Sequence, residues 1–247
     1  MMTILSPAEI VIMKKACRIT GDALKFAQTI IKPGISTREL DKQISDFILG
    51  QGATLSFKDY QGYPAGICAS VNEVVVHGIP SDRVLVEGDI ISIDVGALYK
   101  GFNGDAARTF PVGKISEEKQ KLIDVTKQGF FEGIKDLKAG MRIGEISHKV
   151  QAYAESFGFS VVRELVGHGV GKHLHEHPSI PNYGKLTDGP IIKENVCLAI
   201  EPMINSGAKD IFVQADGWTI VASDKKPSAH YENTILVTKF GVEILTL

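Results

Sequence analysis

Four carboxylates in or beside apolar, β-branched runs constrain this 247-residue chain more than any other feature. The runs are IISID ending at Asp94, GDAARTF containing Asp105, CLAIE ending at Glu201 and YENTILV containing Glu232. Runs of this kind are typical of buried strands. Acidic side chains rarely enter a core unless they are paired or bind a cation, because a buried charge loses its hydration. Four in one core therefore predict a divalent metal site.

Asp94 and Asp105 are predicted on the two arms of one hairpin, whose loop spans residues 99–104. Cross-strand neighbours on one face of a sheet lie close together. Two unpaired carboxylates at that distance would force one of them to keep its proton, whereas a divalent ion lets both ionise. The plainer interpretation makes Asp105 a turn acid and Asp94 a strand-end acid. The presence of Glu201 and Glu232 favours the metal site.

One histidine, His168 in the glycine-spaced segment GHGVG, completes this group. One imidazole with four carboxylates forms an oxygen-rich set that suits Mn, Fe(II) or Co and differs from closed structural zinc sites. A rival cluster, His173, His175 and His177, would share one face of a strand and could hold a catalytic zinc. Pro178 follows directly, however, and no fourth ligand is evident. We expect His175 in the active site and the other two on the surface.

Two further segments indicate a ligand pocket. His77 ends a valine-rich strand before a Gly-Ile-Pro turn, where a structural histidine is as plausible as a functional one. Residues 59–68 form a Gly/Pro-rich loop with aromatic side chains, which is typical of pocket linings, although aromatics that only cover the core rim are equally plausible. The apolar and polarisable side chains available for such a pocket are Phe57, Tyr60, Tyr63, Cys68 and Trp218.

The chain repeats one pattern, two helices followed by strands. The predicted helices run from the capping box Ser6–Glu9 to residues 32–34, from a second capping box at Ser36–Glu39, from Ser116 to residues 138–140, and over residues 143–157. Strands are predicted at 53–112 and 160–247. Gly34 and Gly140 lie 106 residues apart, and Asp94 and Glu201 lie 107 apart. We expect one α+β domain over 1–247, with pseudo-repeats at about 6–112 and 116–247.

Composition excludes several classes of protein. The formal charge of −2 gives no sign of the basic excess that is typical of nucleic-acid-binding proteins. Three widely spaced cysteines without a CxxC motif indicate a reducing compartment and no disulfide frame. The N-terminus resembles no signal peptide, and no segment is long and apolar enough to span a membrane. We expect a cytoplasmic protein with neither a membrane partner nor sequence-specific nucleic-acid binding.

The ordered motifs resemble the type I methionine aminopeptidases, in their short bacterial form, within the pita-bread (creatinase/aminopeptidase) metallopeptidase family. The motifs are SVNEVVVHGIP at 70–80, IDVG at 93–96, GDAARTF at 104–110, GHGVGKHLHEHP at 167–178, IEPM at 200–203 and YENT at 231–234. The resemblance covers essentially the whole chain. It implies a pita-bread fold with two pseudo-symmetric helix-helix-antiparallel-sheet halves.

The resemblance also implies an activity: removal of the N-terminal methionine from nascent proteins, preferentially when the second residue is small. Two divalent ions (Co, Mn or Fe(II), with Zn and Ni as further options) would be the cofactors. Their implied ligands are Asp94, Asp105, His168, Glu201 and Glu232, with Asp105 and Glu232 bridging. His77, His175 and Glu201 match the catalytic residues. His77 and His175, with Phe57, Tyr60, Tyr63, Cys68 and Trp218, match the substrate-binding residues.

The implied partners are peptide and nascent-protein N-termini, with transient ribosome association, and the family suggests a monomer. Two rivals stay open. An Xaa-Pro peptidase shares the architecture but usually carries a separate N-terminal domain. A pita-bread binding module that has lost catalysis should have lost metal ligands, yet all five are present.

Overall fold

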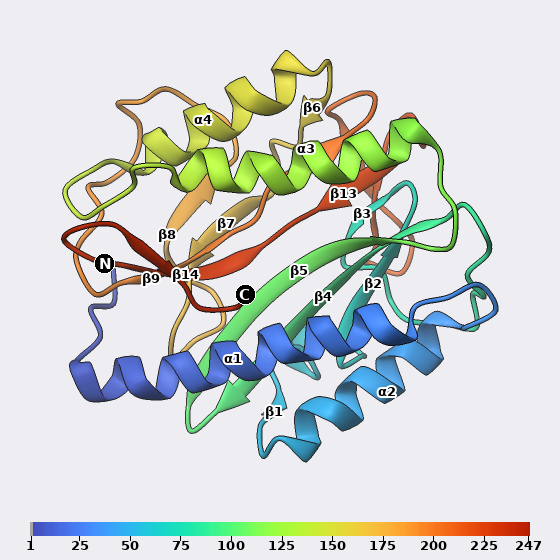
Figure 1. Cartoon of the computed structure of the whole chain (residues 1–247), viewed down its shortest axis with the longest axis horizontal. Coiled ribbons are helices and arrows are strands. Elements are labelled where there is room, and N and C mark those ends of the chain that lie inside the picture. The colour runs from blue at the N-terminus through green and yellow to red at the C-terminus, as the bar shows by residue number, and fades with distance from the viewer. Residues whose placement is uncertain (1) are drawn as a thin grey trace.

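The computed structural model describes residues 2–247, in which two pairs of helices lie on opposite sides of antiparallel strands (Figure 1). The helices are α1 (Pro7–Ile30), α2 (Thr37–Gly50), α3 (Glu117–Ile134) and α4 (Ile143–Ser156), with one short 3-10 turn at Tyr60–Gly62. Among residues 2–247, none of the helices combines the length and apolar character needed to cross a bilayer.

Each helix pair belongs to its own main sheet. The first sheet has the order β1-β4-β2, with β5 paired to β4, and the second has the order β15-β14-β9-β7-β8. Their strands are β1 (Thr54–Leu55), β2 (Ile67–Val71), β4 (Ile90–Tyr99), β5 (Phe102–Pro111), β7 (Val166–Gly169), β8 (Glu176–Pro181), β9 (Cys197–Ile200), β14 (Asn233–Val237) and β15 (Val242–Ile244). This is the expected α+β arrangement of two helix-helix-sheet halves.

Two smaller sheets, each of three strands, complete the described strands. One has the order β13-β10-β6 and the other β11-β12-β3. Their strands are β3 (Val74–Val76), β6 (Ser160–Val161), β10 (Met203–Asn205), β11 (Ile211–Val213), β12 (Ile220–Ala222) and β13 (Ser228–His230). Because β3 comes from the first half and β12 from the second, this pairing also joins the halves.

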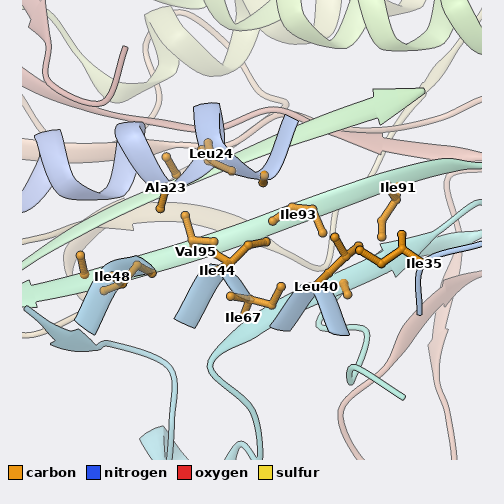
Figure 2. Close-up of a cluster of buried hydrophobic side chains, with 14 of the residues drawn as sticks. Ala23, Leu24, Ile35, Leu40, Ile44, Ile48, Ile67, Ile91, Ile93 and Val95 are labelled. Atoms are coloured by element: carbon orange, nitrogen blue, oxygen red, sulfur yellow. The ribbon is translucent and has the colours of Figure 1, made fainter. Parts of the chain in front are cut away.

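The first core lies between the helix pair α1–α2 and the sheet of β4. Figure 2 shows Leu40, Ile44 and Ile48 of α2 directed toward the strands, opposite side chains from β2 and β4. The apolar side chains of this cluster labelled there are Ala23, Leu24, Ile35, Leu40, Ile44, Ile48, Ile67, Ile91, Ile93 and Val95. A matching core in the second half forms around Phe130, Ile146 and Leu198. Each half thus buries its own helices, which leaves the carboxylates at the junction.

Backbone geometry supports the internal repeat. The helices α2 and α4 both have 14 residues and start 106 residues apart, at Thr37 and Ile143. Gly34 and Gly140, at the same spacing, both have φ of 94°, a left-handed conformation that glycine adopts without strain. Residues 36 and 142 each form an isolated antiparallel bridge, to residues 84 and 191 respectively. The two halves therefore repeat one local design.

The helix starts follow the predicted capping chemistry, with one difference. Ser6 and Glu9 form a complete capping box, in which each side chain satisfies the other's backbone N–H. At Ser36 only half of the predicted box forms. The Ser36 hydroxyl accepts from the Glu39 N–H, but the Glu39 carboxylate does not accept from the Ser36 N–H. Ser116 also caps α3.

Two predicted boundaries were wrong. The hairpin loop is not residues 99–104 but the pair Lys100 and Gly101, because Tyr99 already pairs with Phe102. Both turn residues have positive φ, 46° and 82°, which matches the twist of the strands they join. Helix α3 ends at Ile134, before residues 138–140, because Asp136 adopts a left-handed φ of 62°.

The halves meet where β5 runs beside β14. Ala107 and Glu232 exchange two backbone hydrogen bonds, of 2.9 and 3.3 Å. The partly buried guanidinium of Arg108 donates to the carbonyl of Glu232 and to Oδ1 of Asn233, and stacks over the Tyr231 ring at 4.2 Å. This junction holds carboxylates from both halves at one place.

Candidate active site

The hairpin of β4 and β5 presents two of the predicted acids on one face. Asp94 pairs with Ala107, while Asp105 pairs with Gly96, so the two acids are diagonal neighbours two positions apart. The side chain of Asp105 is almost fully buried, and Asp94 is partly buried. The first half of the chain thus supplies two adjacent carboxylates.

The second half supplies His168 and the two glutamates. His168 lies on β7 and pairs with Ala199 of β9, Glu201 follows the end of β9, and Glu232 directly precedes β14. Glycines flank the histidine because adjoining strands approach closely there. A Cβ at Gly167 would lie 2.5 Å from the Ala199 carbonyl oxygen.

These side chains converge across the junction. Nε2 of His168 lies 3.7 Å from Oδ2 of Asp105 and 3.6 Å from Oε1 of Glu201. Asp105, His168 and Glu232 each place one donor atom within 4.8 Å of the others, and all three are buried. Asp94 and Glu201 line the same cavity. The structure therefore brings together all five residues predicted from the sequence as ligands.

The electrostatics of the group favour a bound cation. Burial, reinforced by Asp105, raises the pKa of Glu201 and Glu232 well above the ordinary range, and burial raises the pKa of Asp105 to about 7. Oδ1 of Asp94 and Oδ1 of Asp105 are buried and find no hydrogen-bond partner within residues 2–247. Unsatisfied buried carboxylate oxygens are costly unless a cation neutralises them. Four carboxylates and one imidazole fit a hard divalent metal.

Two more predicted histidines face the cavity. His77 follows β3 in a left-handed conformation with φ of 58°, and burial lowers its pKa to about 4. Nδ1 of His175 lies 2.9 Å from the hydroxyl of Tyr60, and the rings of His175 and His168 are 4.4 Å apart. Burial also lowers the pKa of His175. Both imidazoles are therefore neutral groups poised beside the acids.

The opposite wall is apolar and aromatic. Phe57, Tyr63, Cys68 and Leu174 form one buried cluster, against which Tyr60 and Trp218 pack. The Tyr63 hydroxyl donates toward the carbonyls of Ile67 and Gly78, both at 3.1 Å, which turns its ring toward Trp218. The wall is thus built from the side chains predicted for the pocket, with Leu174 added.

One cavity of about 200 Å³ joins both walls. Its lining contains every candidate site residue: Phe57, Tyr60, Tyr63, Cys68, His77, Asp94, Asp105, His168, His175, Glu201, Trp218 and Glu232. Pockets for drug-sized molecules occupy roughly 300–1,000 Å³, so this volume suits a single side chain. A wider groove of about 470 Å³ shares His77, His168, His175 and Glu201 with it and reaches exposed residues such as Glu164 and His177.

The rival histidine cluster does not assemble. Residues 171–175 form bends, and β8 begins only at Glu176, so the three imidazoles share no strand face. His173 is exposed, and His177 lies on the outer groove. These positions match the expected surface placement of both residues.

His230 is a buried site neighbour that the sequence analysis missed. Its Nε2 lies 3.5 Å from Oε2 of Glu201 and 4.0 Å from Oε2 of Glu232, and burial lowers its pKa to about 3. The signal available in the sequence was its position two residues before Glu232, which in a strand places both side chains on one face.

Comparison with known proteins supports a metallopeptidase. The model of metallopeptidase family M24 matches residues 11–239. The chain is 50% identical over 248 residues to a methionine aminopeptidase of Clostridium acetobutylicum, covering 100% of this chain and 99% of that protein. It is 51% identical over 241 residues to methionine aminopeptidase 1 of Bacillus subtilis, covering 98% and 97%.

Solved structures show the same relationship. The crystal structure of a methionine aminopeptidase from Rickettsia prowazekii superposes with a TM-score of 0.98 at 39% identity, and 100% of both chains is covered. Prolidase from Pyrococcus furiosus gives a TM-score of 0.81 at 26% identity, and this chain covers only 65% of it. The pita-bread fold predicted from the sequence is thereby confirmed.

Proposed function

Because the chain belongs to metallopeptidase family M24 and matches its methionine aminopeptidases over its whole length, we propose that it removes the N-terminal methionine from peptide chains. The observation that carries this function is the single cavity in which five potential metal ligands face an apolar, aromatic wall. The acids supply the hydrolytic chemistry, and the wall supplies the selectivity.

We assign Asp94, Asp105, His168, Glu201 and Glu232 as the residues that would hold two divalent ions. Co, Mn and Fe(II) suit an oxygen-rich set with one imidazole, and Zn and Ni are further options. When bound, such a pair supplies Lewis-acid stabilisation and makes water acidic enough to act near neutral pH. The orphaned oxygens of Asp94 and Asp105 support this assignment.

The remaining polar residues are assigned to the peptide. Neutral His175 donates a hydrogen bond to the oxygen that becomes negative at the scissile carbonyl, and His77 holds the scissile amide. Glu201 carries the proton from the attacking water to the leaving amine. Tyr60, bonded to Nδ1 of His175, directs the Nε2 edge of that imidazole away from itself and supports this role.

The inner cavity is assigned to the methionine side chain. An unbranched thioether fits an apolar slot with polarisable walls such as Cys68, Tyr63 and Trp218. The outer groove, which begins at His77 and His175, accommodates the residues that follow. A preference for a small second residue is part of the proposal. Cytoplasmic location, a monomeric state, nascent chains as substrates and transient contact with the ribosome stay predictions.

Hydrolysis of Met-Ala-Ser tests the function. Chelated protein should release no methionine, and Mn, Fe(II) or Co should restore release, with metal analysis giving the stoichiometry. Xaa-Pro peptides assayed in parallel distinguish the prolidase-like rival. Cleavage that persists after complete chelation would refute the proposed chemistry.

A ligand variant sharpens this test. Glu232→Ala should abolish turnover even with saturating metal, because it removes one of the three convergent donors that would hold the ions. Glu243→Ala, which changes an exposed glutamate of β15, is the matched control and should behave like the unmodified protein. Near-normal turnover in Glu232→Ala would contradict the ligand assignment.

A further inference from the structure

His230 is held rigidly in the core beside the candidate metal ligands. Its side chain is only 2% exposed, at the end of β13. The backbone N–H of His230 donates to Oγ1 of Thr109, and the same hydroxyl donates to the His230 carbonyl, both at 2.9 Å. Oγ of Ser92 lies 2.8 Å from that hydroxyl and completes the chain of bonds. The backbone of His230, from which the imidazole extends, is therefore held by β4 and β5 of the other half.

One nitrogen of this imidazole, Nε2, is buried without a hydrogen-bond partner among the described residues. The polar atoms that it faces are carboxylate oxygens, Oε2 of Glu201 at 3.5 Å and Oε2 of Glu232 at 4.0 Å. A buried nitrogen aimed at two carboxylates acts as a donor, because neither acid offers it a proton once ionised.

Glu201 lies between two imidazoles and divides its oxygens between them. Oε1 is 3.6 Å from Nε2 of His168, and Oε2 is 3.5 Å from Nε2 of His230. The donor atoms that converge within 4.8 Å belong to Asp105, His168 and Glu232, so the imidazole that faces Oε1 belongs to this group and the one that faces Oε2 does not. Oε1 of Glu201 therefore lies beside the convergent group, and Oε2 lies beside His230.

We propose that His230 is a positioning residue whose Nε2–H donates to Oε2 of Glu201 and so directs Oε1 toward the metal site. The proposal rests on the proposed function, since it requires Glu201 to be a ligand. The separation of 3.5 Å is long for a hydrogen bond. Outer groups of this kind fix a ligand's orientation and raise its affinity for metal.

Titration of chelated protein with Co(II) tests the proposal, using calorimetry for affinity and visible absorption for coordination. His230→Leu fills the space without a donor and should weaken Co(II) binding about 10–100-fold. His230→Gln keeps an N–H and should recover most of that loss. His173→Leu, at an exposed histidine outside the cavity, should leave affinity unchanged. Melting of the chelated variants shows whether each is folded.

The outcomes separate the alternatives. Equal affinity and spectra for His230→Leu and the unmodified protein overturn the positioning role. A loss in His230→Gln as large as in His230→Leu, with altered absorption bands in both, also overturns it and identifies a direct ligand. Failure of the unmodified protein to bind Co(II) refutes the proposed function itself.

A second measurement does not depend on a folded leucine variant. Nitrogen NMR of histidine-labelled protein, loaded with diamagnetic Zn, should show a one-bond N–H coupling at Nε2 of His230. The His230→Gln spectrum identifies the resonance. A proton-free Nε2 in the loaded protein overturns the proposal.

Discussion

Thr234 and the backbone of Asp105 exchange two hydrogen bonds across the junction of the halves. The Asp105 N–H donates to Oγ1 of Thr234 at 3.2 Å, and that hydroxyl donates to the Asp105 carbonyl at 2.8 Å. Thr234 belongs to β14, and Asp105 to β5. A side chain of one half therefore fixes the backbone that carries a site carboxylate of the other.

Replacement of Thr234 by valine should destabilise the protein. The isosteric side chain leaves the buried N–H and C=O of Asp105 without their partner, at a cost of about 1–3 kcal/mol. Thr234→Ser keeps the hydroxyl and should lose much less. Urea unfolding of chelated protein measures both, and Thr29→Val, at an exposed threonine of α1, serves as the control. A valine variant as stable as the unmodified protein would show that the exchange contributes nothing.

The metal-free protein should become less stable as pH rises above neutrality. Burial raises the pKa of Asp105 from 3.8 to about 7, so its stabilising contribution is complete below 3.8 and is lost as pH rises through 7. Burial also raises the pKa of Glu201 and Glu232 well above the ordinary range, so their ionisation continues this loss above neutrality. The lowered pKa values of His77, His168 and His230 change the free energy of unfolding only below about pH 6.5, the pKa of the unfolded imidazole. Above neutrality, only the carboxylates determine whether the free energy of unfolding rises or falls with pH.

Urea unfolding of chelated protein from about pH 7 to about pH 8.5 should therefore show a falling free energy of unfolding. Asp105→Asn, which cannot ionise, should give a shallower slope. Metal affinity should rise over the same range, because ligands bind metal in their deprotonated forms. A stability that increases with pH in the chelated protein would contradict the burial effect.

His175 should contribute to turnover and little to metal binding. Removing one oxyanion donor typically costs about 10²–10³-fold in kcat, and we expect a loss of this size in His175→Ala. Tyr60→Phe releases Nδ1 of the ring and should cause a smaller loss in kcat. Steady-state kinetics with Met-Ala-Ser measures both, with His148→Ala on the exposed face of α4 as the control. Unchanged kcat in His175→Ala would remove this residue from the catalytic group.

Trp218 should contribute to methionine selectivity. Its ring packs edge-on against Tyr63, with centroids 5.2 Å apart, at the apolar wall of the cavity. Trp218→Leu should lower kcat/KM by about 10–100-fold through lost apolar contact, worth about 1.5–3 kcal/mol, with Co(II) affinity unchanged. Phe212→Leu, an exposed aromatic on β11, is the matched control. Equal kcat/KM in both variants would place the methionine pocket elsewhere.

The sequence predicted the repeated architecture because its signals are local. Capping residues at Ser6 and Ser116 and the apolar stripes of the helices depend on neighbours within a turn or two. The acids were predicted from their setting in apolar strands, and the residues that form the site come from β4, β5 and β7 and from the ends of β9 and β14.

The remaining features depend on contacts distant in sequence. The half-formed capping box at Ser36 reflects side-chain placement that a motif does not determine. Helix α3 ends before the predicted glycine because Asp136 adopts a left-handed backbone conformation. Residues 134–139 contain no glycine that would have indicated this turn. His230 was missed because a histidine in a short run gives no hint of Glu201, which lies 29 residues earlier and beside it in space.

The two backbone hydrogen bonds between Ala107 and Glu232 join halves that pack around separate cores. The first half carries Asp94 and Asp105, and the second carries His168, Glu201 and Glu232. No fragment that contains a single core can assemble the assigned set. The assigned set is complete only when the segment that carries Glu232 and β14 has docked beside β5. Metal binding would therefore stabilise the docked arrangement of the two halves relative to either half alone.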